Sequence, residues 1–578
     1  MLNKLVLLPS ARLVPAELRP DLGPIPSGMV PVNSRPALHR IAEPYAAKGF
    51  SAAVAVYEAA PRVCDYMLAH PELNIQCVNV GDTSSIGETV AKALDLLPAP
   101  RSLVIQFADT LIGDAIDARD FICYQDREDV YRWTTFEIAA GGDIYGVAEK
   151  NTAKARAGRM PAFVGAFGFG RPEHFSALLA QCLDDPDPGL DPFYSAVVEY
   201  FNSLSPGRRR LIPVKDWMDV GHLDTYYASQ RKFFLGSRAF NSLCVDPGRG
   251  VIRKTSENAA KLQNEIAWYL GLPAQLQYLA PRVFDHSTEP ANTFADIEFY
   301  GYPALNDVYV YGEWDLGVWS QVLQGIGLAL DGMATHLDPS ATPDNSRQAI
   351  HEMYVLKTAE RLWPLLEDPR MGVLCQDSLE INGRVCTGLA RSLEAIPRMM
   401  DLLHIYDCPP FTVIHGDLCL SNILYDRRAG FVRLIDPRGA FGRIGIYGDP
   451  RYELAKLSHS FEGDYDFLVN GLFEVRQEPG RVSLTPALRR HHRAIKQLFH
   501  SWLLERSRDR YQQVKFIEAL LFLSMASLHQ DRPRSQFAFL TRALEILQDI
   551  ADAASCCSIH EGVIHDGAAE HNYHYHGR

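Results

Sequence analysis

The stretch FTVIHGDLCLSNILY (residues 411–425), followed by LIDPRG (residues 434–439), sets the fold expected for this chain. It places Asp417 and Asn422 with four residues between them, and Asp436 directly after a short apolar strand. Transfer of a phosphoryl group to a hydroxyl uses a carboxylate that accepts the hydroxyl proton. It also uses an amide and an acid that hold Mg²⁺ against the nucleotide phosphates. The three side chains supply these groups in order, so the stretch predicts a phosphoryl-transfer site.

The order His-Gly-Asp-x-x-x-x-Asn, which begins at His415, resembles the catalytic loop of the aminoglycoside phosphotransferase and choline kinase branch of the protein-kinase-like fold. The resemblance implies a bilobal α+β domain that uses ATP and Mg²⁺. It implies that Asp417 is the catalytic base and that Asn422 and Asp436 bind Mg²⁺. His415 would orient the loop by hydrogen bonding, and Asp449, in a later Gly-Asp-Pro segment, would support it. The alternative is that these residues only form turns and end a strand.

The small lobe of such a fold supplies a lysine for the nucleotide phosphates and a glutamate that pairs with it. Lys254, on the strand-like segment 251–256, and Glu265, on the helical segment that follows, are the candidates. An ordinary surface pair is the alternative. No Gly-x-Gly-x-x-Gly loop precedes Lys254, and the segment 297–303 is the candidate for the hinge that binds adenine.

Composition limits the classes of protein that are compatible with the chain. It has 578 residues, of which 47% are hydrophobic and 22% charged, which predicts a globular protein of two or more domains. The net charge of −13 gives no general attraction to nucleic acid. Eleven cysteines without a Cys-x-x-Cys spacing indicate reduced thiols, and no segment reaches the ~18 apolar residues of a membrane span. We expect a cytoplasmic protein without nucleic-acid partners. The sequence does not indicate its oligomeric state.

The order of strand-like and helical segments predicts two domains and a tail. Residues 1–235 alternate helical patterns with five strand-like segments and therefore predict an α/β domain with a largely parallel sheet: 5–8, 52–56, 75–80, 103–107 and 163–169. Residues 236–555 begin with short strands, among them 308–311, and continue with long helices. Residues 556–578 are rich in histidine. We expect a flexible tail there, with metal binding as the alternative.

Two segments of the first domain each contain a candidate metal-binding aspartate. The strand LVIQFADTLI (residues 103–112) leads to Asp109, and DWMDVGH (residues 216–222) contains Asp219. Both segments resemble the sugar nucleotidyltransferase family, which joins a sugar phosphate to an NTP and releases pyrophosphate. The resemblance implies a Rossmann-like (GT-A-like) fold. Two carboxylates from separate strand ends can hold Mg²⁺ across the reacting phosphates, so Asp109 and Asp219 are predicted metal ligands.

Further segments extend this resemblance. VAEK (residues 147–150) resembles the family's Glu-Lys segment, which implies that Lys150 binds the sugar phosphate and Glu149 a sugar hydroxyl. PAFVGAFG (residues 161–168) resembles the next strand, which lines the sugar pocket. The turn at residues 84–89 is a candidate for contact with the nucleobase.

The phosphate-binding loop departs from the family pattern. Arg12 remains and is expected to contact the nucleotide, but the glycines of the loop are missing and Ser27 stands where the family has a lysine. Loss of a cation that stabilises the transition state ordinarily costs orders of magnitude in rate. Either another cation substitutes, or the domain is slow, or it binds without turnover.

The two resemblances together predict a bifunctional enzyme. It would phosphorylate a sugar or polyol with ATP and then couple the phosphate to a second NTP, as in fusions that activate precursors of bacterial capsule and surface polysaccharides. One alternative keeps the kinase active and makes the first domain a non-catalytic nucleotide-sugar-binding domain. A scaffold is disfavoured by the intact Asp417, Asn422 and Asp436, and a glycosyltransferase by the absence of Asp-x-Asp at residue 109.

Overall fold

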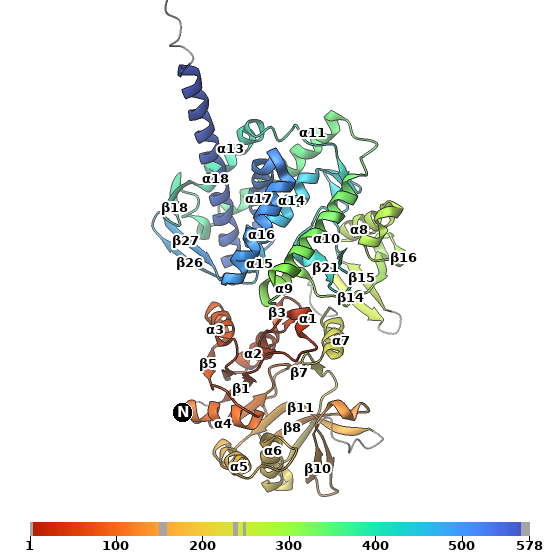
Figure 1. Cartoon of the computed structure of the whole chain (residues 1–578), viewed down its shortest axis with the longest axis vertical. Helices are drawn as coiled ribbons and strands as arrows, with labels where there is room; N and C mark the ends of the chain where they lie inside the picture. Colours follow the sequence, from red (N-terminus) through yellow and green to blue (C-terminus); the bar gives the residue numbers. More distant parts are fainter. Residues whose placement is uncertain (1–3, 150–158, 235–240, 247–249, 568–578) are drawn as a thin grey trace, which may run out of the picture. The chain divides into compact units, whose positions relative to one another are not determined.

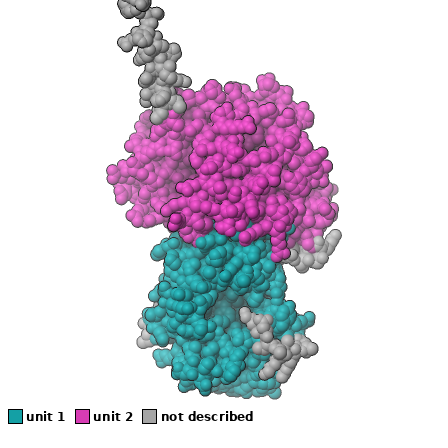
Figure 2. Space-filling view, viewed as in Figure 1, with its two compact units in different colours: residues 1–245, 301–314 teal, residues 246–300, 315–578 magenta. Residues whose placement is uncertain are grey.

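The computed structural model describes residues 4–149, 159–234, 241–246 and 250–567. Contacts divide the chain into two compact units, which are coloured separately in Figure 2. Unit 1 comprises residues 1–245 and 301–314, and unit 2 comprises residues 246–300 and 315–578. The division therefore falls after residue 245 rather than 235, and the sequence did not predict that the segment 301–314 belongs to unit 1.

The centre of unit 1 is a nine-stranded sheet with the order β10-β9-β11-β6-β1-β4-β5, in which β8 also pairs with β11 and β12. All five segments expected as strands lie in it. The strands are β1 (Leu5–Ser10), β4 (Ser51–Val56), β5 (Ile75–Asn79), β6 (Leu103–Gln106), β8 (Phe121–Arg127), β9 (Thr135–Ile138), β10 (Ile144–Ala148), β11 (Met160–Phe169) and β12 (Arg210–Pro213). β6, β1, β4 and β5 run parallel, whereas β11 is antiparallel to β6, β8 and β9. The sheet is thus mixed, and the expectation of a largely parallel sheet holds only for its first half.

Helices cover both faces of this sheet (Figure 1). Alternate residues of the parallel strands, such as Leu5 and Leu7, form one buried core with the helices α4 (Ile86–Leu96), α5 (Pro172–Asp184) and α6 (Pro192–Ser203). The residues between them, such as Val6 and Leu8, are equally buried, and α2 (Ala37–Ala47) packs against β1 and β4. Burial on both faces explains the continuous apolar runs of these strands. The N-terminal part is a Rossmann-like α/β unit, as predicted.

The segment 301–314 contains α9 (Leu305–Tyr311), a helix whose seven residues are all buried. The strand expected at residues 308–311 is therefore wrong. Apolar side chains at Leu305 and Val308 have helical spacing, which a four-residue window does not show. Arg62 holds the end of the helix, because it donates to the carbonyl oxygens of Tyr311 and Gly312 at 2.7 and 2.6 Å.

The division between the units falls within β14 (Asn241–Asp246), of which only the last residue belongs to unit 2. The first strands that lie wholly in unit 2 pair in the order β15-β17-β16. The elements of this part are β15 (Val251–Ser256), α8 (Ala259–Gly271), β16 (Val283–Ser287) and β17 (Phe294–Glu298). The side chain of Asn258 caps α8, because it accepts a hydrogen bond from the N–H of Lys261 at 3.1 Å. Alternation along β15 buries Lys254 and leaves Arg253 half-exposed and paired with Asp296.

The rest of unit 2 is largely helical. Its longer helices are α10 (Leu316–Ala334), α12 (Lys357–Leu366), α13 (Leu389–Leu402), α14 (Pro450–Phe461), α16 (Arg490–Ser507), α17 (Tyr511–Ala526) and α18 (Pro533–Gly567). The largely buried α17 lies at the centre, in contact with α12, α14 and α18. α18 extends into the histidine-rich segment that the sequence presents as a tail. Among the described residues, no helix is both long and apolar enough to cross a membrane.

Candidate functional site

The loop that carries Asp417 and Asn422 lies between β20 (Thr412–Val413) and β21 (Ile423–Asp426) in unit 2. β21 forms a hairpin with β22 (Phe431–Leu434), and Asp436 follows β22 with a left-handed backbone, φ 56°. The amide nitrogen of Asn422 donates to the backbone oxygen of Asp417 at 2.8 Å and to its Oδ2 at 3.2 Å. The hairpin therefore brings the three side chains that the sequence singled out to one end of two short strands.

His415 joins the loop to the segment of Asp436. It is fully buried, its Nε2 donates to the carbonyl oxygen of Ile435 at 2.9 Å, and its Nδ1 accepts from the N–H of Asp417 at 3.3 Å. Burial lowers the pKa of His415 to about 4, so the ring is neutral at physiological pH. A neutral, hydrogen-bonded ring suits the orienting role expected from the sequence and not proton transfer.

Lys254 and Glu265 form a buried pair that also reaches Asp436. Lys254 Nζ lies 2.8 and 2.7 Å from the two carboxylate oxygens of Glu265 and 2.7 Å from Asp436 Oδ1. Burial disfavours the charged amine, but Asp436 and Glu265 outweigh it and raise the pKa of Lys254 above its ordinary value. The structure thus excludes the surface-pair alternative and places a permanent positive charge beside the predicted metal ligand.

Oxygen atoms suited to Mg²⁺ are present at this site. Asn422 directs its amide nitrogen to Asp417, and its oxygen accepts one long hydrogen bond from Ser421 Oγ at 3.4 Å, which leaves its second lone pair for a metal ion. Asp436 adds a carboxylate. Mg²⁺ is usually held by one or two protein oxygens together with substrate phosphates, so this set fits. No group of three or more His, Cys, Asp or Glu side chains in the described residues is arranged to hold a metal ion by itself.

Lys456, which the sequence analysis did not identify, pairs directly with the predicted base. Its Nζ lies 2.8 Å from Asp417 Oδ1. Burial acts to raise the pKa of Asp417, but Lys456, with Arg438 and His415, holds it well below its usual range. The side chain of Asp417 remains 42% exposed, so an ionised carboxylate is accessible to a substrate.

Side chains of helix α14 hold the catalytic loop through hydrogen bonds. Glu453 accepts the N–H groups of His415 and Gly416 at 3.0 and 2.9 Å, and its burial raises its pKa to about 7. Asp449 caps the helix at the N–H of Arg451 and pairs with that guanidinium. The support expected from Asp449 therefore acts through the helix. The sequence signal for Glu453 and Lys456 was their spacing of three on one helical face after a capping aspartate.

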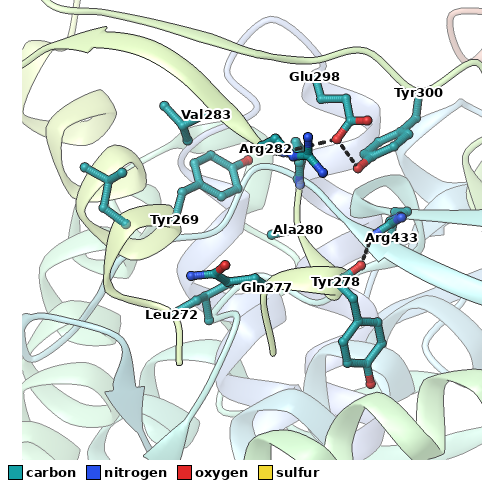
Figure 3. A pocket seen from close by; sticks show the side chains of 12 residues that line it. Tyr269, Leu272, Gln277, Tyr278, Ala280, Arg282, Val283, Glu298, Tyr300 and Arg433 are labelled. Carbon is teal, nitrogen blue, oxygen red and sulfur yellow. Dashed lines mark hydrogen bonds between the residues drawn. The ribbon is translucent and has the colours of Figure 1, made fainter. Parts of the chain in front are cut away.

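A cavity of about 450 Å³ adjoins this site (Figure 3). Figure 3 shows Tyr269, Gln277 and Arg282 on its walls, with Glu298 hydrogen-bonded to Tyr300. The hydroxyl of Tyr269 accepts from the N–H of Asp436 at 3.2 Å and donates to Glu265 at 3.3 Å. Tyr269 therefore connects the cavity to the Lys254 pair.

Unit 1 brings Asp109 and Asp219 together. β7 (Thr110–Leu111) pairs with β13 (Met218–Asp219), and the N–H of Val220 donates to Asp109 O at 2.9 Å. A Cβ atom at Gly221 would lie 2.7 Å from Asp109 Oδ2 and 3.4 Å from Asp219 Oδ1. The two carboxylates thus face the same small space, which only glycine leaves open. Two carboxylate oxygens in such a space fit Mg²⁺ if substrate phosphates complete its coordination.

A cavity of about 330 Å³ in unit 1 is lined by Arg12, Ser27, Asp109 and the start of α4. Arg12 contacts Asp82 at 2.8 Å and the carbonyl oxygen of Thr83. Ser27 Oγ lies 3.4 Å from Ser10 Oγ. Arg12 is the one basic side chain among the described residues that line this cavity.

The remaining predicted residues of unit 1 have different outcomes. The expected turn at residues 84–89 is instead the N-terminus of α4, capped by Ser85. The charge of Glu149 acts with burial, Asp191 and Asp109 to raise the pKa of Tyr194. Lys150 lies outside the described residues.

No protein-family model and no curated protein matches the chain. Solved structures similar to its N-terminal part include HddC from Yersinia pseudotuberculosis complexed with GMP-PN, with 17% identity over 40% of this chain and 100% of that chain, at a TM-score of 0.30. The CTP:phosphocholine cytidylyltransferase LicC from Streptococcus pneumoniae is 12% identical over 39% of this chain and 98% of that chain, at a TM-score of 0.33. The nucleoside-diphosphate-sugar pyrophosphorylase from Vibrio cholerae RC9 is 16% identical over 39% of this chain and 99% of that chain, at 0.31.

Proposed function

We propose that unit 2 is an ATP-dependent kinase that phosphorylates the hydroxyl of a small metabolite, a sugar or polyol. The observation that carries this proposal is the contact of Lys254 with both Glu265 and Asp436, at the end of the hairpin that also positions Asp417 and Asn422. A lysine for phosphates, two oxygen ligands and a carboxylate base are the parts that phosphoryl transfer requires.

Each residue of the unit 2 site has a separate role in this phosphoryl transfer. Lys254 binds nucleotide phosphates, and Asn422 and Asp436 would hold Mg²⁺, which neutralises charge on the transferring group. Asp417 lies where it can accept the proton of the acceptor hydroxyl. The hydroxyl oxygen bonds to the γ-phosphorus as the bond to the β,γ-bridging oxygen breaks, so the products are the phosphate ester, ADP and a proton. Lys456 keeps Asp417 ionised until the proton arrives.

For unit 1 we propose nucleotidyl transfer to the same phosphate ester. A non-bridging phosphate oxygen of the ester would bond to the α-phosphorus of an NTP as the bond to the α,β-bridging oxygen breaks, which releases pyrophosphate. Asp109 and Asp219 would hold Mg²⁺, and Arg12 would bind the phosphates. The product, a nucleotide-activated metabolite, is the form in which precursors of capsule and surface polysaccharides are used. The convergence of both carboxylates at Gly221 supports this step.

A second candidate for unit 1 is binding of a nucleotide sugar without turnover. Two observations favour it: Ser27 replaces the expected lysine, and Arg12 is already engaged by Asp82 and Glu58. Under this alternative unit 2 remains a kinase and unit 1 only binds a nucleotide sugar.

Analysis of the reaction products distinguishes nucleotidyl transfer by unit 1 from binding without turnover. Purified full-length protein is incubated with Mg²⁺, ATP, the other NTPs and a polar metabolite extract, and the products are identified by mass spectrometry. D417A is expected to make neither product, and D219A to stop at the phosphomonoester. A phosphomonoester as the sole product of the native protein would support the binding alternative. No phosphorylated product at all would contradict the kinase.

A further inference from the structure

A group of basic side chains lies around Asp417. Lys456 pairs with it directly, and Arg438 is among the charges that lower its pKa. Lys357 and Arg361 come from α12, one helical turn apart, so they share one face of that helix. Arg438 acts electrostatically on both of them. These four residues, Lys357, Arg361, Arg438 and Lys456, are called the basic cluster below.

The basic cluster carries more positive than negative charge. Lys456 uses its charge on Asp417, and Asp417 is the carboxylate that acts most strongly on Lys357. Arg438 donates to the hydroxyl of Tyr452 at 2.8 Å, which is a neutral partner. Glu453 also interacts electrostatically with Lys456, and no carboxylate other than Asp417 is among the main charges that act on Lys357.

The interactions of Arg361 with its neighbours compensate its charge only weakly. It donates to the backbone oxygen of Ser524 at 3.3 Å, and the carboxylate that acts on it, Glu360, is exposed to solvent. Burial and the nearby Arg438 lower the pKa of Arg361. Its guanidinium therefore retains hydrogen-bonding capacity for an anion.

Lys357 is the residue of the basic cluster whose charge is least compensated by its neighbours. It is half-buried, and its ammonium has no hydrogen-bond or ion-pair partner within the part of the chain that the structure describes. Burial, reinforced by Arg438, Arg361 and Lys456, lowers the pKa of Lys357 to about 6, although Asp417 opposes this. A partly buried amine without a partner destabilises a fold, so its presence points to a ligand. A π-helical turn (Glu352–Leu356) directly precedes it, and such turns occur often at functional sites.

We propose that the acceptor phosphorylated by unit 2 carries an anionic group, a carboxylate or a phosphate, which Lys357, Arg361 and Arg438 bind beside Asp417. The inference rests on the proposed kinase function and narrows its substrate class to acidic sugars or polyols. The location supports an acceptor subsite and not a nucleotide subsite, because the cluster surrounds Asp417 whereas Lys254 contacts Asp436. Binding of the anion also satisfies Lys357, whose charged form the bound anion stabilises.

Acceptors that differ only in charge test the proposal. The panel is glycerol, 2-amino-1,3-propanediol, D-glycerate and glycerol 3-phosphate, with glucose, glucosamine, glucuronate and glucose 6-phosphate as a second series. Full-length protein with Mg²⁺ and ATP should phosphorylate acidic members in preference, and the better of the carboxylate and phosphate members identifies the anion. Loss of a charge-assisted hydrogen bond predicts that K357M and R361M each lower kcat/KM about tenfold or more, mainly through KM. Preference for a neutral or cationic acceptor, unchanged by K357M, would overturn the proposal.

A binding measurement decides the case in which no panel member is phosphorylated. D-Glycerate, glycerol 3-phosphate and inorganic phosphate are titrated calorimetrically into the protein, with and without Mg²⁺ and a non-hydrolysable ATP analogue. We expect the K357M/R361M double variant to bind at least one of them about tenfold more weakly or worse. If the native protein binds none of these anions, or binds them no more tightly than the double variant, the anionic subsite is refuted. If the native protein does not bind the ATP analogue, the kinase function itself is refuted.

Two controls separate binding from folding. R370M removes an equal charge from an exposed arginine that pairs with Asp368, and it should leave every constant unchanged. K357M should melt at a higher temperature than the native protein while it binds anions more weakly, because it removes a half-buried amine that has no partner among the described residues. A lower melting temperature would mean that Lys357 is structural and would contradict its assignment.

Discussion

Replacement of Lys456 by methionine tests the state of the proposed base. Although burial raises the pKa of Asp417, Lys456 Nζ at 2.8 Å is the strongest of the charges that hold it below its usual range. An opposite charge at such a distance lowers the pKa of an aspartate by about 1–3 units. K456M should therefore raise the pKa of Asp417 by about 1–2 units, which corresponds to about 1–3 kcal/mol of lost preference for the ionised form.

The assay is the pH dependence of kcat/KM for acceptor phosphorylation. Activity requires ionised Asp417, so the acid limb of the K456M profile should lie about 1–2 units higher than that of the native protein. K456R, which retains the charge, should resemble the native protein. An acid limb that does not move in K456M would refute the argument that Lys456 keeps the base ionised.

K456M should also lower the free energy of unfolding. Because the folded-state pKa of Asp417 lies below its unfolded value of 3.8, its ionised form stabilises the protein above that pH, and this contribution is lost as the pH falls through the folded pKa. The carboxylate is 42% exposed, so solvent screens the pair and K456M should cost only about 1 kcal/mol at pH 7. Urea unfolding at pH 7 and near pH 3 should show this difference shrink at the lower pH.

Three further perturbations have distinct expected outcomes. K254M leaves Glu265 without its cation, so it should abolish nucleotide binding by unit 2 and destabilise that unit by about 3 kcal/mol, measured by nucleotide titration and urea unfolding; native-like affinity would contradict the role of Lys254. G221A places a methyl group 2.7 Å from Asp109 Oδ2, so Mg²⁺-dependent nucleotide binding to unit 1 should fall while acceptor phosphorylation persists; unchanged binding would show that the carboxylates need not converge. A chain that begins at residue 246 leaves the seven buried residues of α9 uncovered, so it should aggregate or unfold at a lower temperature in calorimetry; a native melting temperature would refute this.

The catalytic loop was predictable because its chemistry is local in sequence. Asp417 and Asn422 precede the hairpin of β21 and β22 and Asp436 follows it, so pairing of two adjacent strands brings them together. Asp109 and Asp219 are far apart in the chain, but each ends a recognisable strand, and the structure brings both to Gly221.

The supporting residues were not predictable in the same way. Glu453 and Lys456 lie on helix α14. Whether their side chains reach the catalytic loop depends on how this helix packs. The same limit applies to α9, because its last four residues, 308–311, suit a strand until their burial in unit 1 is known. The basic cluster also arises from tertiary packing, because α12, α14 and the segment after β22 each contribute to it.

Transfer of an isotopic label tests most directly whether the two sites act in sequence. The full-length protein is supplied with ATP labelled at the γ-phosphorus, an acidic acceptor, Mg²⁺ and unlabelled CTP, GTP or UTP in separate reactions. The account predicts a nucleotide-linked product whose labelled phosphorus is the one bonded to the acceptor, and no such product from D417A. An unlabelled nucleotide-linked product, or label that appears only in inorganic phosphate, would contradict it.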